Sequence, residues 1–82
     1  MHSQEASCLL SVEFIFENGK TYTASYTTTA TGNDIGSAEH NALHECIALF
    51  EIDAAVQTIK FDSIILKTNQ CFAVRTAFEN DD

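Results

Sequence analysis

The sequence predicts an α+β domain in which one helix covers a four-stranded antiparallel sheet, as a two-layer sandwich in the order ββαββ. Three observations predict this architecture. The segment Ser37–Phe50 has apolar residues at the three- and four-residue spacing of a helix. The regions on both sides of it alternate apolar and polar residues, as strands do. Turn signals at Asn18-Gly19 and at Thr68-Asn69-Gln70 divide each flanking region into a hairpin.

The helical segment has one apolar side and one polar side. Ser37 is expected to be its N-cap, because a serine hydroxyl can accept a hydrogen bond from a free amide of the first turn. We expect the helix to end within Glu51–Ala55, where acidic residues suit the negative end of the helix dipole poorly. The residues expected to face the sheet are Ala42, Leu43, Cys46, Ile47, Leu49 and Phe50.

The first hairpin is expected to join strands at Cys8–Phe16 and Thr21–Thr31. A two-residue turn at Asn18-Gly19 would put the tyrosines of the second strand on the wrong face, because a one-residue slip reverses every side chain. A three-residue loop, Glu17–Gly19 with Gly19 in the left-handed conformation, pairs Phe14 with Tyr22 instead. The same register pairs Leu10 with Tyr26.

The second hairpin is expected to join strands at Gln57–Thr68 and Cys71–Glu79, with Leu66 opposite Phe72. The helix would then leave one sheet face uncovered, and that face would carry several apolar residues. An uncovered antiparallel face is normally polar, so this one is either a partner interface or a surface that other side chains cover. The residues expected there are Leu9, Ile15, Ile59, Phe61 and Ile65.

The chain is short and acidic, with 82 residues and a formal net charge of −8. Its length predicts one domain, covering residues 1–82, and its charge argues against direct binding of free nucleic acid. No Lys or Arg occurs between Lys20 and Lys60. The acidic residues there form either a solvated face or a patch that meets a protein partner with a basic surface. They are Asp34, Glu39, Glu45, Glu51 and Asp53.

The compartment is inferred from the cysteines and from the absence of targeting signals. Cys8, Cys46 and Cys71 show no CxxC spacing and sit in apolar patterns, which is typical of buried thiols in a reducing compartment. No stretch has the length of a membrane span or the pattern of a signal peptide. We therefore expect a cytoplasmic protein with no membrane partner.

The sequence offers few residues for chemistry. His40 and His44 lie four residues apart, as in half of a zinc site, but a structural zinc site needs about four ligands. The usual clusters of a catalytic site are absent, so we expect no enzymatic activity, no bound metal and no cofactor.

One stretch resembles the middle of the ribonuclease H fold: a hairpin, a helix with Glu39, and a strand with Asp62-Ser63. The resemblance implies a two-metal site held by carboxylates, with Glu39 and Asp62 as two of them. The first strand of this chain has Phe14-Ile15-Phe16 where that family needs an aspartate, so the resemblance implies at most an inactive remnant.

In its small size, its acidity and its expected architecture of one helix and one sheet, the chain resembles the small anti-defence proteins of phages, such as anti-CRISPR proteins. That likeness implies an inhibitor that docks on a nucleic-acid-binding host complex, in the host cytoplasm. The alternative is a structural or regulatory homo-oligomer, a homodimer for example, which pairs through the uncovered sheet face or the edge strand Thr21–Thr31. The expected partner-binding residues are Asp34, Glu39, Glu45, Glu51, Asp53, Ile15, Phe61 and Ile65.

Overall fold

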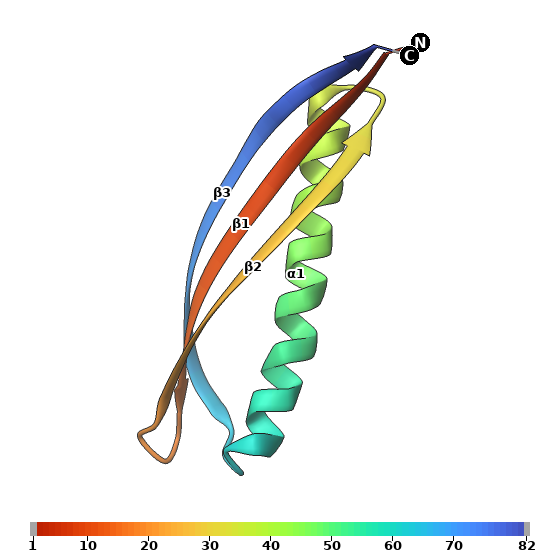
Figure 1. The fold of residues 1–82 in the computed structure, drawn as a ribbon. Helices are drawn as coiled ribbons and strands as arrows, with labels where there is room; N and C mark the ends of the chain where they lie inside the picture. Colours follow the sequence, from red (N-terminus) through yellow and green to blue (C-terminus); the bar gives the residue numbers. More distant parts are fainter. Residues whose placement is uncertain (1, 82) are drawn as a thin grey trace.

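Three long antiparallel strands and one long helix follow each other in the order ββαβ (Figure 1). The computed structural model describes the backbone of residues 2–81 and the side chains of residues 4–74. The sheet order is β2-β1-β3, so β1 is the central strand. The elements are β1 (His2–Phe16), β2 (Thr21–Gly32), α1 (Ile35–Lys60) and β3 (Ile65–Asp81).

The predicted four-stranded ββαββ sandwich is wrong, because the second hairpin does not form. β3 is one strand of 17 residues, and Thr68-Asn69-Gln70 continues straight through it, paired with Phe14, Glu13 and Val12 of β1. The three residues include no glycine, and only Asn69 readily adopts the left-handed conformation of a tight hairpin. A single long strand also satisfies the backbone of β1 along its whole free side, which two short strands would not do.

The helix is also longer than predicted, because it runs for 26 residues and ends at Lys60 rather than within Glu51–Ala55. No Gly or Pro interrupts it after Gly36, and Phe50, Ala54 and Gln57 continue the row that faces the sheet. Asp34, not Ser37, is the N-cap: its Oδ1 accepts a hydrogen bond from the Ser37 amide at 2.8 Å. The tertiary packing of this row outweighs the poorly placed acidic residues.

The first hairpin has the predicted register. Phe14 pairs with Tyr22 and Leu10 pairs with Tyr26, and Gly19 has a φ of 85°, the left-handed conformation that glycine adopts without a steric cost. β1 begins at His2, earlier than the predicted Cys8. The alternation of side chains therefore determined this hairpin correctly.

The core lies between one face of β1 and small residues of α1. The even-numbered side chains of β1 from Ala6 to Phe16 point toward the helix and are buried, as are Ala38, Ala42 and Cys46. Small helix residues allow the helix axis to approach the sheet closely. Phe14 stacks on both Tyr22 and Phe50, with ring centroids 5.7 Å apart in each pair. The buried β1 residues are Ala6, Cys8, Leu10, Val12, Phe14 and Phe16.

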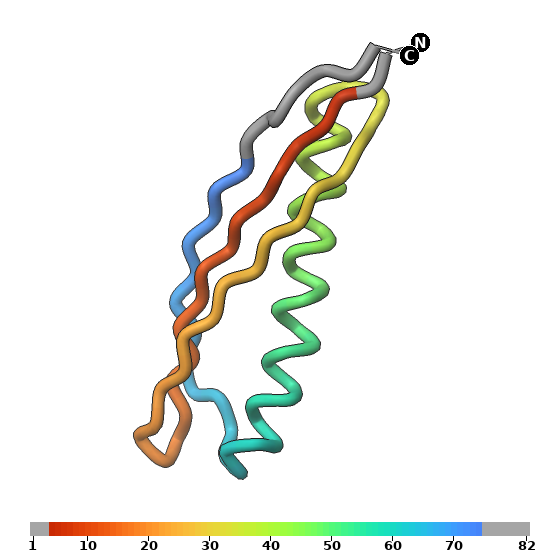
Figure 2. Tube along the Cα trace, in the orientation of Figure 1, coloured from red at the N-terminus to blue at the C-terminus, as the bar shows by residue number. Residues whose placement is uncertain are grey.

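The molecule is narrow and elongated, with dimensions of 52 × 17 × 13 Å. Its radius of gyration is 15.4 Å, whereas a compact domain of this length would have about 12 Å. The helix lies mainly against β2 and β1 and much less against β3 (Figure 2). One helix of this length cannot cover three strands, so apolar side chains remain exposed.

The outer sheet face is mostly polar, and the prediction of an apolar outer face is wrong. The odd-numbered residues of β2 are exposed threonines and Ser25, and among the five predicted residues only Leu9 is clearly exposed on this face. Ile15 is half-buried there, whereas Ile59 belongs to the helix. Phe61 and Ile65 pack against the core. The residues Gln57–Lys60, predicted to begin a strand, belong to the end of α1, and Asp62 and Ser63 lie in the connection that follows it.

Candidate protein interface

A row of four aliphatic side chains lies exposed along the C-terminal half of α1. Leu49, Ile52, Val56 and Ile59 are 44%, 64%, 51% and 80% exposed. They follow one another at intervals of three, four and three residues, which places them on one side of the helix, as in the seam of a coiled coil. We call these four residues the helix stripe.

The helix stripe is separate from the row that faces the sheet. Ala38, Ala42 and Cys46 are fully buried and Gln57 is nearly so. A surface helix of a globular protein normally has one apolar side and a polar remainder. The helix stripe is therefore a second apolar side of α1, which the described part of the chain leaves uncovered.

The chain after the helix extends this apolar surface. Ile59 and Ile64 line one shallow hollow of about 440 Å3, together with Asp62 and Ser63 of the connection. Ile64 is 63% exposed, and the first hairpin holds the connection in place. The Asn18 amide donates to Ser63 Oγ at 3.3 Å, and the Glu17 amide donates to the Ile64 carbonyl at 3.0 Å. These bonds present the isoleucines on a fixed backbone.

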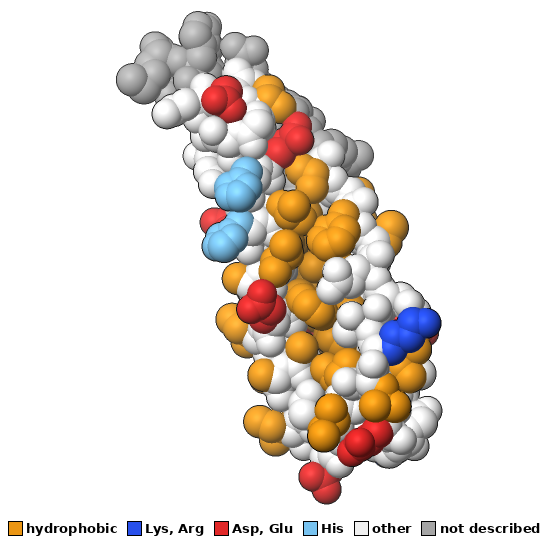
Figure 3. Space-filling view, turned by 180° about the vertical axis from the view of Figure 1, so that it is seen from behind, with side chains coloured by type: hydrophobic (Ala, Val, Ile, Leu, Met, Phe, Trp, Pro, Cys, Tyr) orange, Lys and Arg blue, Asp and Glu red, His pale blue; other side chains and the backbone are white. Residues whose placement is uncertain are grey.

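Hydrophobic side chains also dominate the face opposite to the view of Figure 1. Figure 3 shows them as a nearly continuous column along the molecule, with acidic side chains scattered beside it rather than gathered. Phe72 contributes to the exposed apolar area on the helix-bearing side of β3, since it pairs with the buried Leu10 and is 46% exposed. The extent of exposed apolar surface is more than single scattered residues account for.

The five predicted acidic residues do not form one patch. Asp34 caps the helix, and Asp53 accepts hydrogen bonds from the Tyr26 hydroxyl and from Gln57 Nε2, the latter at 3.1 Å. Glu45 and Glu51 are exposed, but they are six residues apart, which separates them by about 120° around the helix. Glu39 is half-buried.

The polar group around Asp53 serves the interior. Burial, together with the neighbouring Asp53 carboxylate, raises the pKa of Tyr26, so its hydroxyl stays protonated and donates. Gln57 is buried, and its Oε1 has no hydrogen-bond partner. This network joins the middle of β2 to the C-terminal half of α1, and both carboxylate oxygens of Asp53 accept a hydrogen bond within the chain.

The three apolar residues predicted to bind a partner lie elsewhere. The ring of Phe61 lies 4.8 Å from that of Phe16, and the Lys20 ammonium lies 5.7 Å from the Phe61 ring centroid. Ile65 pairs with Phe16 and packs against the core. Ile15 is half-buried on the outer sheet face. None of them belongs to the helix stripe. The predicted helix ended before Val56 and Ile59, and Leu49, which was expected to face the sheet, is 44% exposed.

The residues considered for metal binding are not brought together. The rings of His40 and His44 stack with centroids 6.2 Å apart, on an exposed part of α1. Glu39 and Asp62 lie near opposite ends of the helix, about 35 Å apart from the rise of 1.5 Å per residue. Among the residues whose side chains are described, no group of three or more His, Cys, Asp or Glu could hold a metal ion.

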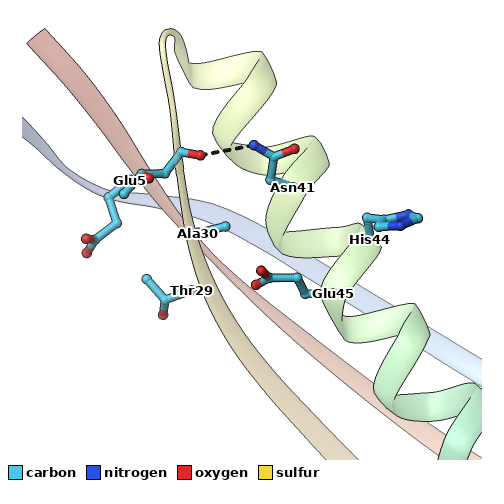
Figure 4. Close-up of a pocket in the computed structure, with 7 residues that line it drawn as sticks. Glu5, Thr29, Ala30, Asn41, His44 and Glu45 are labelled. Carbon is cyan, nitrogen blue, oxygen red and sulfur yellow. Dashed lines mark hydrogen bonds between the residues drawn. The ribbon is translucent and has the colours of Figure 1, made fainter.

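A second hollow, of about 440 Å3, lies where α1 passes the free edge of β2 (Figure 4). Glu45 points toward β2, whereas His44 points away from the strands and Glu5 lies on the far side of β2. Asn41 Nδ2 donates to the Thr31 carbonyl at 3.0 Å. The polar groups diverge, so this hollow does not have the converging geometry of a catalytic site.

A comparison with models of protein families, with curated proteins and with solved structures finds no match to this chain. Within the described residues, α1 is too polar to cross a bilayer.

Proposed function

We propose that this chain is a non-enzymatic protein-binding module that docks through the helix stripe. The observation that carries the proposal is the exposure of Leu49, Ile52, Val56 and Ile59 at coiled-coil spacing on a well-packed helix. A groove that accepts an amphipathic helix, or a second helix, is the complementary surface for such a stripe.

The size of the stripe supports a role in binding. Its exposed fractions amount to between two and three complete aliphatic side chains. Burying that much surface contributes about 4–7 kcal/mol, at 1.5–3 kcal/mol for each side chain, before the costs of association. The apolar area that the partner buries adds to this figure. A micromolar complex requires about 8 kcal/mol of net binding free energy.

The net charge of −8 favours a partner with a basic surface, because opposite charges accelerate association. The narrower form of the proposal is the inhibitor inferred from the sequence, an anti-CRISPR-type protein that docks on a nucleic-acid-binding complex. Among the five predicted acidic residues, Glu45 and Glu51 are exposed and take no part in the helix cap or in the hydrogen bonds around Asp53. Burial of the helix stripe would supply most of the affinity for the partner, and the negative charge would accelerate the encounter with its basic surface.

The stripe is tested by affinity capture from a lysate of the cells that express the protein. The variant Ile52→Glu/Ile59→Glu places charges in the stripe, and Leu9→Glu places one on the outer sheet face at a similarly exposed leucine. We expect the wild type and Leu9→Glu to retain the same proteins and the stripe variant to lose them, with far-UV circular dichroism unchanged. If all three retain the same proteins, the stripe is not the docking surface.

The charge is tested separately by Glu45→Lys/Glu51→Lys and by salt. We expect the capture of a basic partner to fall at 0.5 M NaCl, where the Debye length shrinks to about 4–5 Å, and to fall further in this variant. Capture that neither salt nor charge reversal changes would remove the basic partner from the proposal and leave the apolar docking surface.

A further inference from the structure

β2 is an edge strand that lacks the usual protection against pairing with another chain. Its 12 residues, Thr21–Gly32, include no charged residue and no proline, and its pairing with β1 contains no bulge. Proteins that remain monomeric usually guard such an edge with a charge, a proline or a bulge. The free edge of β2 therefore offers backbone groups to a further strand.

One hydrogen bond shows which groups face this edge. Asn41 Nδ2 donates to the Thr31 carbonyl, so the backbone of Thr31 is directed away from β1. Alternate residues of an antiparallel strand direct both of their backbone groups to the same side. The backbone groups of Thr23, Ser25 and Thr27 hence face outward too, in the middle of the strand.

The helix stripe lies on the same side of the molecule as this edge. Glu45 is one turn before Leu49 and seven residues before Ile52, so it belongs to the same row of the helix. It lines the hollow beside Thr29–Thr31 and points toward β2 (Figure 4). The stripe continues this row toward the C-terminal end of α1.

We propose that the partner of the helix stripe is a second copy of this chain. In this dimer β2 pairs with β2 in antiparallel orientation, the two sheets form one of six strands, and the two stripes pack against each other. The inference rests on the proposed function and names the partner of the same surface. A two-fold axis relates the copies, as in most homodimers.

The spacing of the layers agrees with this arrangement. The helix lies over β1 and β2 to a similar extent, so its axis projects near the boundary between them. The two-fold axis lies half a strand spacing outside β2, and strands are about 4.8 Å apart. The two helix axes would then be about 10 Å apart, within the range of packed helices.

The alignment along the strands agrees as well. Tyr26, near the middle of β2, bonds to Asp53, which lies near the middle of the stripe. A two-fold axis that passes beside Tyr26 places Ile52 of one copy against Val56 of the other, and Leu49 against Ile59. The same alignment puts Glu45 of one copy within about a turn of Lys60 of the other, and both side chains are exposed.

The buried area reaches the size that a specific dimer needs. At about 60–120 Å2 for a complete aliphatic side chain, the two stripes contribute about 300–600 Å2. The paired β2 strands and their threonines supply the remainder of the ~1,000 Å2 of a specific interface. The two copies carry the same net charge of −8, so added salt would strengthen this association.

Sedimentation equilibrium of the full chain tests the dimer, from 1 to 100 µM and at 50 and 500 mM NaCl. We expect a monomer–dimer equilibrium that tightens at the higher salt. Ile52→Glu should weaken it at least tenfold, and Leu9→Glu should leave it unchanged. A monomer at 100 µM in both salts, or a dimer that Ile52→Glu does not weaken, would overturn the inference.

Cross-linking tests the geometry in a Cys71→Ser background, which removes the exposed native thiol. Ala48 and Ala55 are both exposed and lie one heptad apart on α1. Ala55→Cys lies next to the proposed axis but about 100° around the helix from Val56, so the two thiols of a dimer are about 10 Å apart, and a bifunctional maleimide of that length should join them. Ala48→Cys lies about 18 Å from its mate along the helix axes, so the same reagent should not join that pair. Cross-linking through position 48 instead of position 55 would refute this antiparallel alignment.

The two proposals can fail separately. A strictly monomeric chain whose stripe variant loses captured proteins overturns the homodimer and keeps the docking function with another protein. Equal capture by wild type and stripe variant, together with a monomer at 100 µM, overturns the docking function, whereas equal capture with a dimer that Ile52→Glu weakens keeps the stripe as a docking surface for a second copy.

Discussion

The end of β2 passes so close to the first turn of α1 that only glycine fits at position 32. A Cβ added to Gly32 would lie 2.6 Å from the Ala38 amide nitrogen, 2.8 Å from Ser37 Cβ and 2.9 Å from the Ser37 carbonyl carbon. None of these atoms can move by a side-chain rotation, so Gly32→Ala forces the strand end and the helix start apart.

We expect Gly32→Ala to destabilise the fold by about 2–3 kcal/mol, the upper part of the range for overpacking. A domain of this length has a total stability of about 4–12 kcal/mol. With a urea m-value of about 1 kcal/mol/M, the unfolding midpoint should fall by about 2–3 M. The melting temperature should fall by about 8–24 °C.

Gly36→Ala is the matched control, because Gly36 lies only four residues further on, in the first turn of α1, and has room for a Cβ. Its Cβ would meet only Asp34 Oδ1, at 3.3 Å, and alanine favours a helix more than glycine does, so the change should stay within about 1 kcal/mol. Equal urea midpoints for wild type and Gly32→Ala would refute the close approach. A loss in Gly36→Ala as large as in Gly32→Ala would show that the connection tolerates no change, for a reason other than the contact at Gly32.

Three further changes probe the remaining interactions. Asp34→Ala removes the hydrogen bond that the Ser37 amide donates to the N-cap carboxylate. Urea unfolding should show that this variant has a free energy of unfolding about 1 kcal/mol lower than the wild type, whereas Asp34→Asn should retain most of the wild-type stability. Tyr26→Phe removes the hydroxyl that donates to the half-buried Asp53, and the free energy of unfolding should fall by about 1.5–3 kcal/mol. A fall of less than about 0.5 kcal/mol would contradict a stabilising role of this hydrogen bond. Burial, and secondly the adjacent Cys46 thiol, raises the pKa of Cys8 from 9.0 to about 11. Between these values the unfolded chain releases a proton that the native chain keeps, so urea unfolding should show stability falling as pH rises from 9 to 11, by at most about 1.4 kcal/mol per pH unit for this group. Cys8→Ala should flatten this dependence, and an equally steep decline in that variant would mean that other groups cause it.

The first hairpin was readable from the sequence because its information is local. The alternation of Phe14 and Phe16 with polar residues, and the glycine at position 19, determine both the buried face and the loop length. The existence of one helix was readable for the same reason, whereas its N-cap is Asp34 and not the predicted Ser37. Its apolar period is strong between Ala42 and Phe50.

The helix end and the third strand depended on contacts far apart in the sequence. The segment from Ile52 to Ile59 is apolar on two sides, so its own pattern does not distinguish a long helix from a strand. Thr68-Asn69-Gln70 resembles a turn locally, but it continues as a strand because β1 offers a free edge of matching length.

The candidate interface likewise depended partly on the sequence and partly on contacts between distant segments. The sequence determined the composition of the surface, its acidity and its excess of apolar residues. Only the tertiary structure decided which apolar residues stay uncovered, because a helix of 26 residues covers β1 and β2 with one side and leaves Ile52 and Ile59 on another. Burial is a property of what packs against a side chain, and that is not encoded in the pattern of any single segment.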